Sequence, residues 1–185
     1  MLIVRTDPTG LDWYVQKLQT KIHNYLVGAS GWNLSDPNKY EAYGRCYRNK
    51  AADGYIAEVY KSGSEYKEVY WNDRLTAISF FGISGLIKHS VKHEAEVHFV
   101  MFANLKKLYP DATHRMDEEL RQLVYGIIGK SSYGFTVTSI ELWLENVLRE
   151  YPGSRRDKWL KTVDMHPVTC FRINMKLFFD PNKNC

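Results

Sequence analysis

Apolar and polar positions alternate regularly from Glu94 to Leu105, and this period of two residues predicts a β-strand. The side chains expected to share one side of the strand are Ala95, Val97, Phe99, Met101 and Ala103. Glu96, His98, Val100 and Phe102 are expected on the other side. Because both sides carry apolar residues, we expect this strand to lie in the interior of a sheet.

A helical period is present near the start of the chain. Apolar residues recur at steps of three and four between Leu11 and Leu26, which predicts one buried face of an amphipathic helix. Asp7 is expected to cap this helix, with Pro8 as its first residue and Gly28 at its end.

Short runs rich in tyrosine, valine and isoleucine follow a loop over residues 29–38. They cover residues 41–47, 54–61 and 65–71, separated by the turn sequences NKAADG and SGS, and predict antiparallel strands. The apolar sequence VTCFRINMKLFF, near the end of the chain, predicts a closing strand.

Two further helices are expected in the second half of the chain. Thr113 is the expected cap of the first, which has acidic residues in its first turn and an apolar stripe from Met116 to Ile128. Thr138 and Glu141 have the spacing of a capping box, which predicts a third helix of the chain that runs to Tyr151.

Residues 72–93 fit no single period, and two glycines interrupt their apolar run. We therefore expect an extended arm or loop there, or a strand with a bulge. Together these elements predict that residues 1–185 form a single α+β domain, in which a mainly antiparallel sheet is flanked by an N-terminal helix and two later helices.

The composition is that of an ordinary globular protein, with 44% hydrophobic and 25% charged residues. The aromatic content of 14% is high, and tyrosine and tryptophan are enriched at protein–protein contacts. No run of about 20 apolar residues is present to cross a membrane, and the first residues lack the pattern of a secretory leader.

The three cysteines form no CxxC pair, so we expect a reduced, cytoplasmic setting for folding.

The sequence KHSVKHEAEVHF raises the question of a metal site, because it contains His89, His93, Glu94 and His98. In a zinc-binding helix the two histidines are four residues apart, whereas His93 and His98 are five apart and are expected on opposite faces of a strand. We therefore expect these residues on the wet face of a sheet or at a subunit contact. A small metal-dependent enzyme is the alternative.

Other catalytic motifs are incomplete. GISG is one residue too short for a nucleophile elbow, and GIIGKS lacks the spacing of a phosphate-binding loop. No catalytic, cofactor-binding or metal-binding residue is predicted.

The net charge is +4, with basic and acidic residues mixed along the chain. One basic cluster, which is the candidate for contact with phosphate, DNA or another subunit, consists of Arg155, Arg156, Lys158 and Lys161. A nucleic-acid-binding accessory protein is a second alternative on this basis.

Three stretches resemble proteins of bacteriophage necks. LDWYVQKLQTKIHNYL resembles the first helix of tail-terminator and neck proteins, and VHFVMFANLKKLYPDATHRMDEELRQLVYGII is similar to their strand, loop and acidic helix start. HPVTCFRINMKLFF is similar to their closing strand. In layout the chain resembles the neck-ring (head–tail connector) proteins of crAss-like bacteriophages.

This resemblance implies a tail-terminator-like fold and a structural subunit, not an enzyme, without cofactor or metal. It implies a ring of identical subunits, twelve with six as the alternative, that joins the portal or adaptor to the tail. The partners would be other neck, portal and tail proteins, and DNA would pass through the lumen without sequence-specific binding. The protein would be assembled in the host cytoplasm and located in the virion, with no membrane association.

Overall fold

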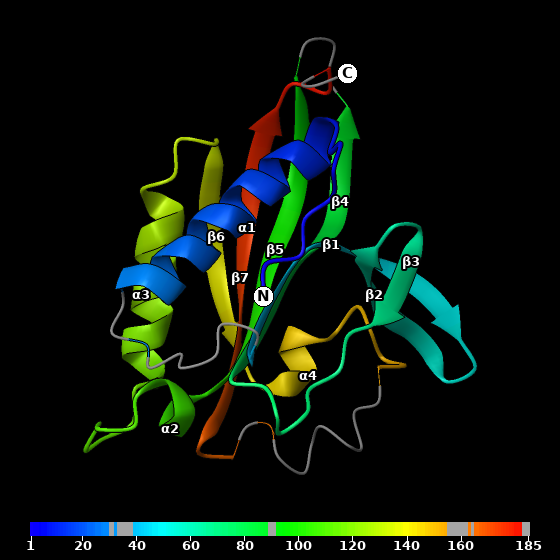
Figure 1. Cartoon of the computed structure of the whole chain (residues 1–185). Coiled ribbons are helices and arrows are strands. Elements are labelled where there is room, and N and C mark those ends of the chain that lie inside the picture. Colours follow the sequence, from blue (N-terminus) through cyan, green and yellow to red (C-terminus); the bar gives the residue numbers. More distant parts are fainter. Residues whose placement is uncertain (30–31, 33–38, 89–91, 155–162, 164, 183–185) are drawn as a thin grey trace.

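The computed structural model describes residues 1–29, 32, 39–88, 92–154, 163 and 165–182. Seven strands form one sheet, and helices lie against it (Figure 1). The helices are α1 (Gly10–Ala29), α2 (Leu105–Leu108), α3 (Asp117–Gly129) and α4 (Leu144–Val147). The strands are β1 (Tyr40–Ala51), β2 (Gly54–Ser62), β3 (Glu65–Glu68), β4 (Ala77–Lys88), β5 (His93–Asn104), β6 (Phe135–Leu142) and β7 (Val168–Phe179).

The strand order is β3-β2-β1-β4-β5-β7-β6. Every neighbouring pair is antiparallel except β1 and β4, which are parallel. The predicted α+β class with a mainly antiparallel sheet is therefore confirmed. The predicted strand over residues 94–105 is β5, which lies inside the sheet between β4 and β7.

Helices α1 and α3 cover one face of the sheet, called here the helix face (Figure 1). Their apolar residues pack on the inward-facing side chains of β5 and β7, including Val97, Phe99 and Ile173. The predicted first helix is confirmed, but it begins at Gly10 instead of Pro8 and ends at Ala29, so Gly28 lies within it. Helix α3 is also confirmed, and it begins after Met116 instead of Thr113.

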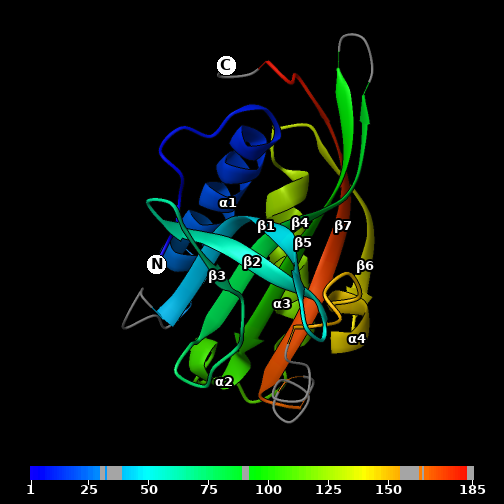
Figure 2. The same cartoon turned by 90° about the vertical axis from the view of Figure 1, so that its right-hand side faces the viewer.

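A second apolar core lies on the other half of the molecule, opposite the helix face. Strand β1 leaves the main sheet after its first half and continues as a hairpin with β2, to which β3 is added (Figure 2). Residues of β2 and α4, such as Val59 and Val147, pack there against Phe80 and Phe102. Among the described residues this core covers only the lower part of the sheet, and no helix covers the upper part of β4, β5, β7 and β6 on this face (Figure 2).

The helix predicted over residues 138–151 is wrong. Residues up to Leu142 form β6, which pairs with β7, and α4 is a single turn that begins at Leu144. The stretch from Thr136 to Ile140 is rich in β-branched residues, which favour a strand, and pairing with the long strand β7 outweighs the capping-box pattern.

Most of the 72–93 segment belongs to the sheet. Residues 77–88 are β4, and the register between β4 and β5 shifts between Ile83 and Gly85, which leaves Ser84 as a bulge. Beyond the bulge, β4 and β5 continue as a hairpin that projects past the helices (Figure 2). Among the described residues, no helix is both long and apolar enough to cross a membrane.

Candidate functional site

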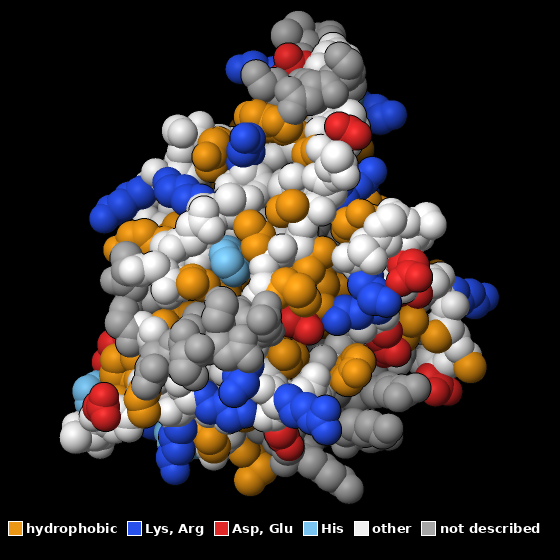
Figure 3. Space-filling view, in the orientation of Figure 1, with side chains coloured by type: hydrophobic (Ala, Val, Ile, Leu, Met, Phe, Trp, Pro, Cys, Tyr) orange, Lys and Arg blue, Asp and Glu red, His pale blue; other side chains and the backbone are white. Residues whose placement is uncertain are grey.

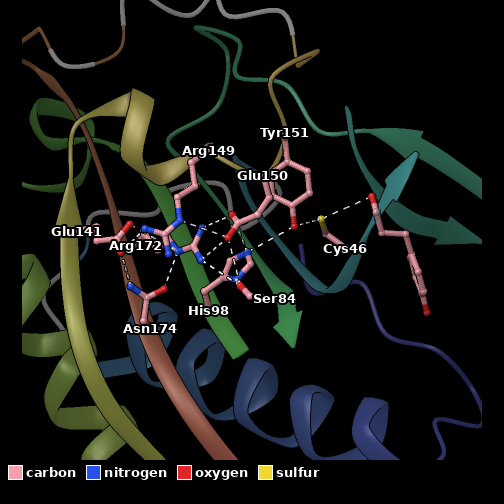
Figure 4. Close-up of polar contacts among 10 residues, drawn as sticks. Cys46, Ser84, His98, Glu141, Arg149, Glu150, Tyr151, Arg172 and Asn174 are labelled. Carbon is pink, nitrogen blue, oxygen red and sulfur yellow. Dashed lines mark hydrogen bonds and ion pairs between the residues drawn. The ribbon is translucent and has the colours of Figure 1, made fainter. Parts of the chain in front are cut away.

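A network of polar side chains lies on the sheet face opposite the helix face (Figure 4). Ser84, His98 and Arg172 project from β4, β5 and β7. Glu150 and Tyr151 reach the network from the segment that follows α4. Alternation along the strands places the three sheet residues on one face. Residues 144–154, called here the α4 segment, fold over them.

The α4 segment is held by β2. The amide of Gly153 donates to the carbonyl of Tyr55 at 2.7 Å, and the amide of Ala57 donates to the Ser154 hydroxyl at 3.2 Å. A Cβ atom at residue 153 would lie 2.7 Å from the backbone of Gly54, so this close approach requires glycine. Glu150 and Tyr151 are thereby fixed in position over the sheet.

Arg172 is the centre of the network and is 1% exposed. Its Nη1 pairs with Glu150 Oε2, its Nη2 donates to Glu150 Oε1 at 2.8 Å, and its Nε donates to Asn174 Oδ1 at 2.6 Å. Burial by itself would raise the pKa of Glu150, but the hydrogen bonds and charge of Arg172 lower it to about 2. The pair is therefore ionised and bidentate, which fixes both side chains.

His98 lies between Ser84 and Tyr151 and is fully buried. Its Nδ1 is 3.1 Å from Ser84 Oγ, and its Nε2 is 3.4 Å from the Tyr151 hydroxyl. Burial, together with the nearby charge of Arg172, lowers the pKa of His98 to about 3. The imidazole is thus neutral at physiological pH and has a hydrogen-bond partner at each ring nitrogen.

Tyr151 links this network to a buried thiol. Cys46 Sγ donates to the Tyr151 hydroxyl at 3.1 Å. Burial raises the pKa of the Cys46 thiol to about 12 and raises the pKa of Tyr151 as well. Both groups are therefore protonated at neutral pH, and Cys46 has neither the thiolate nor the exposure of a nucleophile.

The outer side of the network opens on a shallow groove of about 260 Å³, called here the polar groove. Its carboxylate, guanidinium, ammonium, amide and hydroxyl groups come from Ser84, Glu96, Ser139, Glu141, Arg149, Asn174 and Lys176. Glu141 accepts from Arg149 and from Asn174, each at 2.7 Å. The second oxygen of Glu141 is buried and makes no hydrogen bond to the described residues.

The contacts of the buried network favour a contribution to stability. The buried groups are neutral or paired, and each of the ring nitrogens, hydroxyls and guanidinium nitrogens described above already has a partner. A general base needs a free lone pair that a substrate can reach, and His98 is fully buried. The groove instead offers closely spaced polar groups of both charges, which suit contacts with another polypeptide.

His93 and His98 of the sequence KHSVKHEAEVHF are not brought together. His93 packs on Phe179 on the helix face, whereas His98 lies on the opposite face. Glu94 pairs with Lys176, and His89 lies outside the described residues. Among the described residues no group of three His, Cys, Asp or Glu side chains could hold a metal ion. The expectation that these histidines lie on a wet face is wrong for His98, because the α4 segment covers it.

The basic cluster predicted to contact phosphate, DNA or another subunit lies outside the described residues, namely Arg155, Arg156, Lys158 and Lys161. A different pocket, of about 290 Å³, is lined by Lys106, His114, Arg115 and His166 near the start of α3. Arg115 is paired with Asp117, and His114 with Glu119. On the visible face, basic and acidic side chains are interspersed (Figure 3).

Sequence reasoning missed the central pair of the network, Arg172 and Glu150. One signal was present, because Arg172 interrupts an apolar strand and a buried arginine needs a partner. Its partner lies 22 residues earlier in a segment predicted to be helical, so the pattern alone could not identify it.

Comparison of the chain with protein-family models, curated proteins and solved structures gives no match.

Proposed function

We propose that this protein is a structural subunit of an oligomeric ring in the neck of a bacteriophage virion. The ring would join the portal or adaptor to the tail and form part of the channel for DNA. The observation that carries the ring proposal is an open sheet from which a hairpin projects with apolar side chains on both of its faces. Such a hairpin is stabilised when another surface covers it.

The two edge strands of the sheet are β3 and β6, and each pairs with a neighbour on one side only among the described residues. Free edges expose backbone hydrogen-bonding groups and favour association with another chain. Because β3 has four residues and β6 has eight, the two edges are not equivalent. Contacts between unlike surfaces of identical chains are head-to-tail, and such contacts close into rings when the rotation between subunits allows it.

Large exposed side chains are distributed around the molecule. They include Tyr55, Tyr66, Tyr70, Leu86, Ile87, Tyr125, Trp143 and Phe178. Aromatic residues are enriched at the centres of protein interfaces, where they contribute much of the binding energy. A subunit with a neighbour on each side and other rings above and below would cover several such surfaces.

The position in a virion neck rests on the sequence resemblance to neck-ring proteins of crAss-like phages. We propose twelve subunits, matching the symmetry of a portal, with six as the alternative. The interspersed charges of the surface suit a channel that DNA passes through without sequence-specific binding.

Co-expression with a portal protein from the same genome, followed by electron microscopy, tests this proposal. We expect rings with a central hole, both alone and stacked on portals. A chain that stays monomeric and never joins portal, neck or tail proteins would contradict the proposal.

A further inference from the structure

The projecting part of the β4–β5 hairpin has apolar side chains on both faces. We call this part the arm; it consists of residues 85–88 and 92–96 with the adjacent Phe178 of β7. Leu86 is 49% exposed on the helix face, and Ile87 and Phe178 are each 52% exposed on the other face. Ile87 and Phe178 lie on either side of Glu94 in the same row of the sheet.

The tip of the arm is basic. Lys88 and Lys92 are exposed at the ends of the two strands, and within the described residues neither forms an ion pair. Lys176, by contrast, is paired with Glu94 at 2.8 Å. In the space-filling view both basic and acidic side chains are visible around this end of the molecule (Figure 3). A partner of the arm should therefore combine apolar or aromatic area with negative charge.

Another surface of the same chain has these properties. It is the outer side of β1, β2 and β3, beside the start of α1, and we call it the tyrosine–glutamate face. Its members are Tyr47, Glu58, Tyr60, Tyr66 and Glu68. The ring of Tyr66 packs edge-on against Tyr47 and Tyr60, and Tyr66 is 46% exposed.

The two glutamates of this face lie directly opposite one another on β2 and β3. Like charges in this position repel, and neither Glu58 nor Glu68 forms an ion pair within the described residues. Glu68 Oε1 is buried and makes no hydrogen bond to the described residues. A cation from outside the subunit would relieve the repulsion between the two carboxylates.

We propose that the arm of one subunit docks on the tyrosine–glutamate face of the next copy. Lys88 and Lys92 then pair with Glu58 and Glu68, and the apolar side chains of the arm pack on the tyrosine rings. This inference rests on the ring proposed above, for which it identifies the subunit contact. Because the two surfaces are different parts of the same chain, the contact is head-to-tail.

Charge reversal tests the pairing. The arm variant K88E/K92E and the face variant E58K/E68K should each lose the oligomer at concentrations at which the wild type is assembled, with assembly shifted to roughly tenfold or higher concentration. An equimolar mixture of the arm variant and the face variant should form rings in which the two variants strictly alternate, because each variant's arm is complementary in charge only to the other variant's face. The variant with all four substitutions should also assemble on its own. The control K106E/K130E, which alters two exposed lysines elsewhere, should assemble like the wild type.

Native mass spectrometry separates the outcomes, with circular dichroism to confirm folding. Recovery in the mixture and in the four-substitution variant supports the inference. Oligomers of wild-type size from the arm variant alone would overturn it and leave the ring proposal standing. Dissociation without recovery in either combination would mean that the arm meets a different surface, which also overturns it. A monomeric wild type would overturn the ring proposal and the inference together.

Discussion

Gly82 lies directly opposite His98 across the β4–β5 pair, and the imidazole occupies the space that a side chain on residue 82 would need. A Cβ atom there would lie 2.1 Å from His98 Nε2 and 2.5 Å from the Tyr151 hydroxyl. Gly82→Ala should therefore displace the buried network and lower the free energy of unfolding by about 1–3 kcal/mol. Urea denaturation followed by fluorescence measures this change.

Gly28→Ala is the matched control for this substitution. Gly28 is exposed in α1, and a Cβ atom there would have no neighbour within 4 Å. Alanine should raise stability there by up to about 1 kcal/mol, because it favours the helix. Equal effects of the two substitutions would contradict the packing described for Gly82.

Glu150→Gln should destabilise the protein by about 3 kcal/mol, because it removes the bidentate carboxylate partner of the buried Arg172 and leaves only Glu141, whose carboxylate is 3.9 Å from Arg172 Nε. Replacing both residues, with Arg172→Met added, should cost less than the sum of the two single changes, since no unpaired charge remains. Chemical denaturation of all four proteins gives the coupling energy. Strictly additive effects would show that the pair is not coupled.

The buried histidine predicts how stability depends on pH. The pKa of His98 is about 3 in the folded protein, against an ordinary value of 6.5, so between these values the unfolded chain binds the additional proton. The contribution of the neutral His98 to the free energy of unfolding is fully present above pH 6.5, and it is lost as the pH decreases toward 3. From pH 6.5 to 4.5 the contribution of His98 approaches about 1.4 kcal/mol per pH unit.

His98→Asn should reduce this slope, which denaturation at several pH values measures. The pKa of His23 is also lowered by burial, so that residue contributes in the same direction and its part remains in the variant. The Glu150 contribution appears at lower pH, between about 4.5 and 2. An NMR titration in which the His98 ring protonates near pH 6.5 would contradict the account.

Trp143 combines a backbone φ of 70° with a side chain that is 62% exposed. Positive φ is strained for a residue with a Cβ atom, and it is not strained for glycine. The Trp143→Gly variant should therefore be more stable than the Trp143→Ala variant by about 1 kcal/mol. At most positions the alanine variant is the more stable of the two. Thermal unfolding of the two variants gives this difference, and the usual order would show that residue 143 does not hold this conformation.

The sequence predicted those elements whose pattern comes from burial on a well-defined face. Val97 and Phe99 alternate with His98 and Val100 in β5, which packs against a core on each face, and the stripe of α3 is equally regular. The segment that forms β6 and α4 was predicted wrongly, because Ile140, Leu144 and Leu148 also fit a helical period. Residues 135–142 form a strand instead because they pair with β7, and this pairing cannot be predicted from the local sequence pattern.

The candidate site was less predictable, since it is built from distant segments. Tyr151 and His98 are 53 residues apart in the chain, and Cys46 and Tyr151 are 105 apart. Their contact depends on where the α4 segment folds back, which is set by hydrogen bonds to β2. A polar residue on a strand can face solvent or a covering segment, and the strand sequence is the same in both cases.

The mass of the purified protein in its native state is the most direct test of the ring. The chain has a mass of 21.6 kDa. We predict a single closed assembly of twelve copies, with six as the alternative, that dissociates when the charges of the arm or of the tyrosine–glutamate face are reversed. A species of 21.6 kDa at all concentrations, alone and with the portal protein, would contradict it.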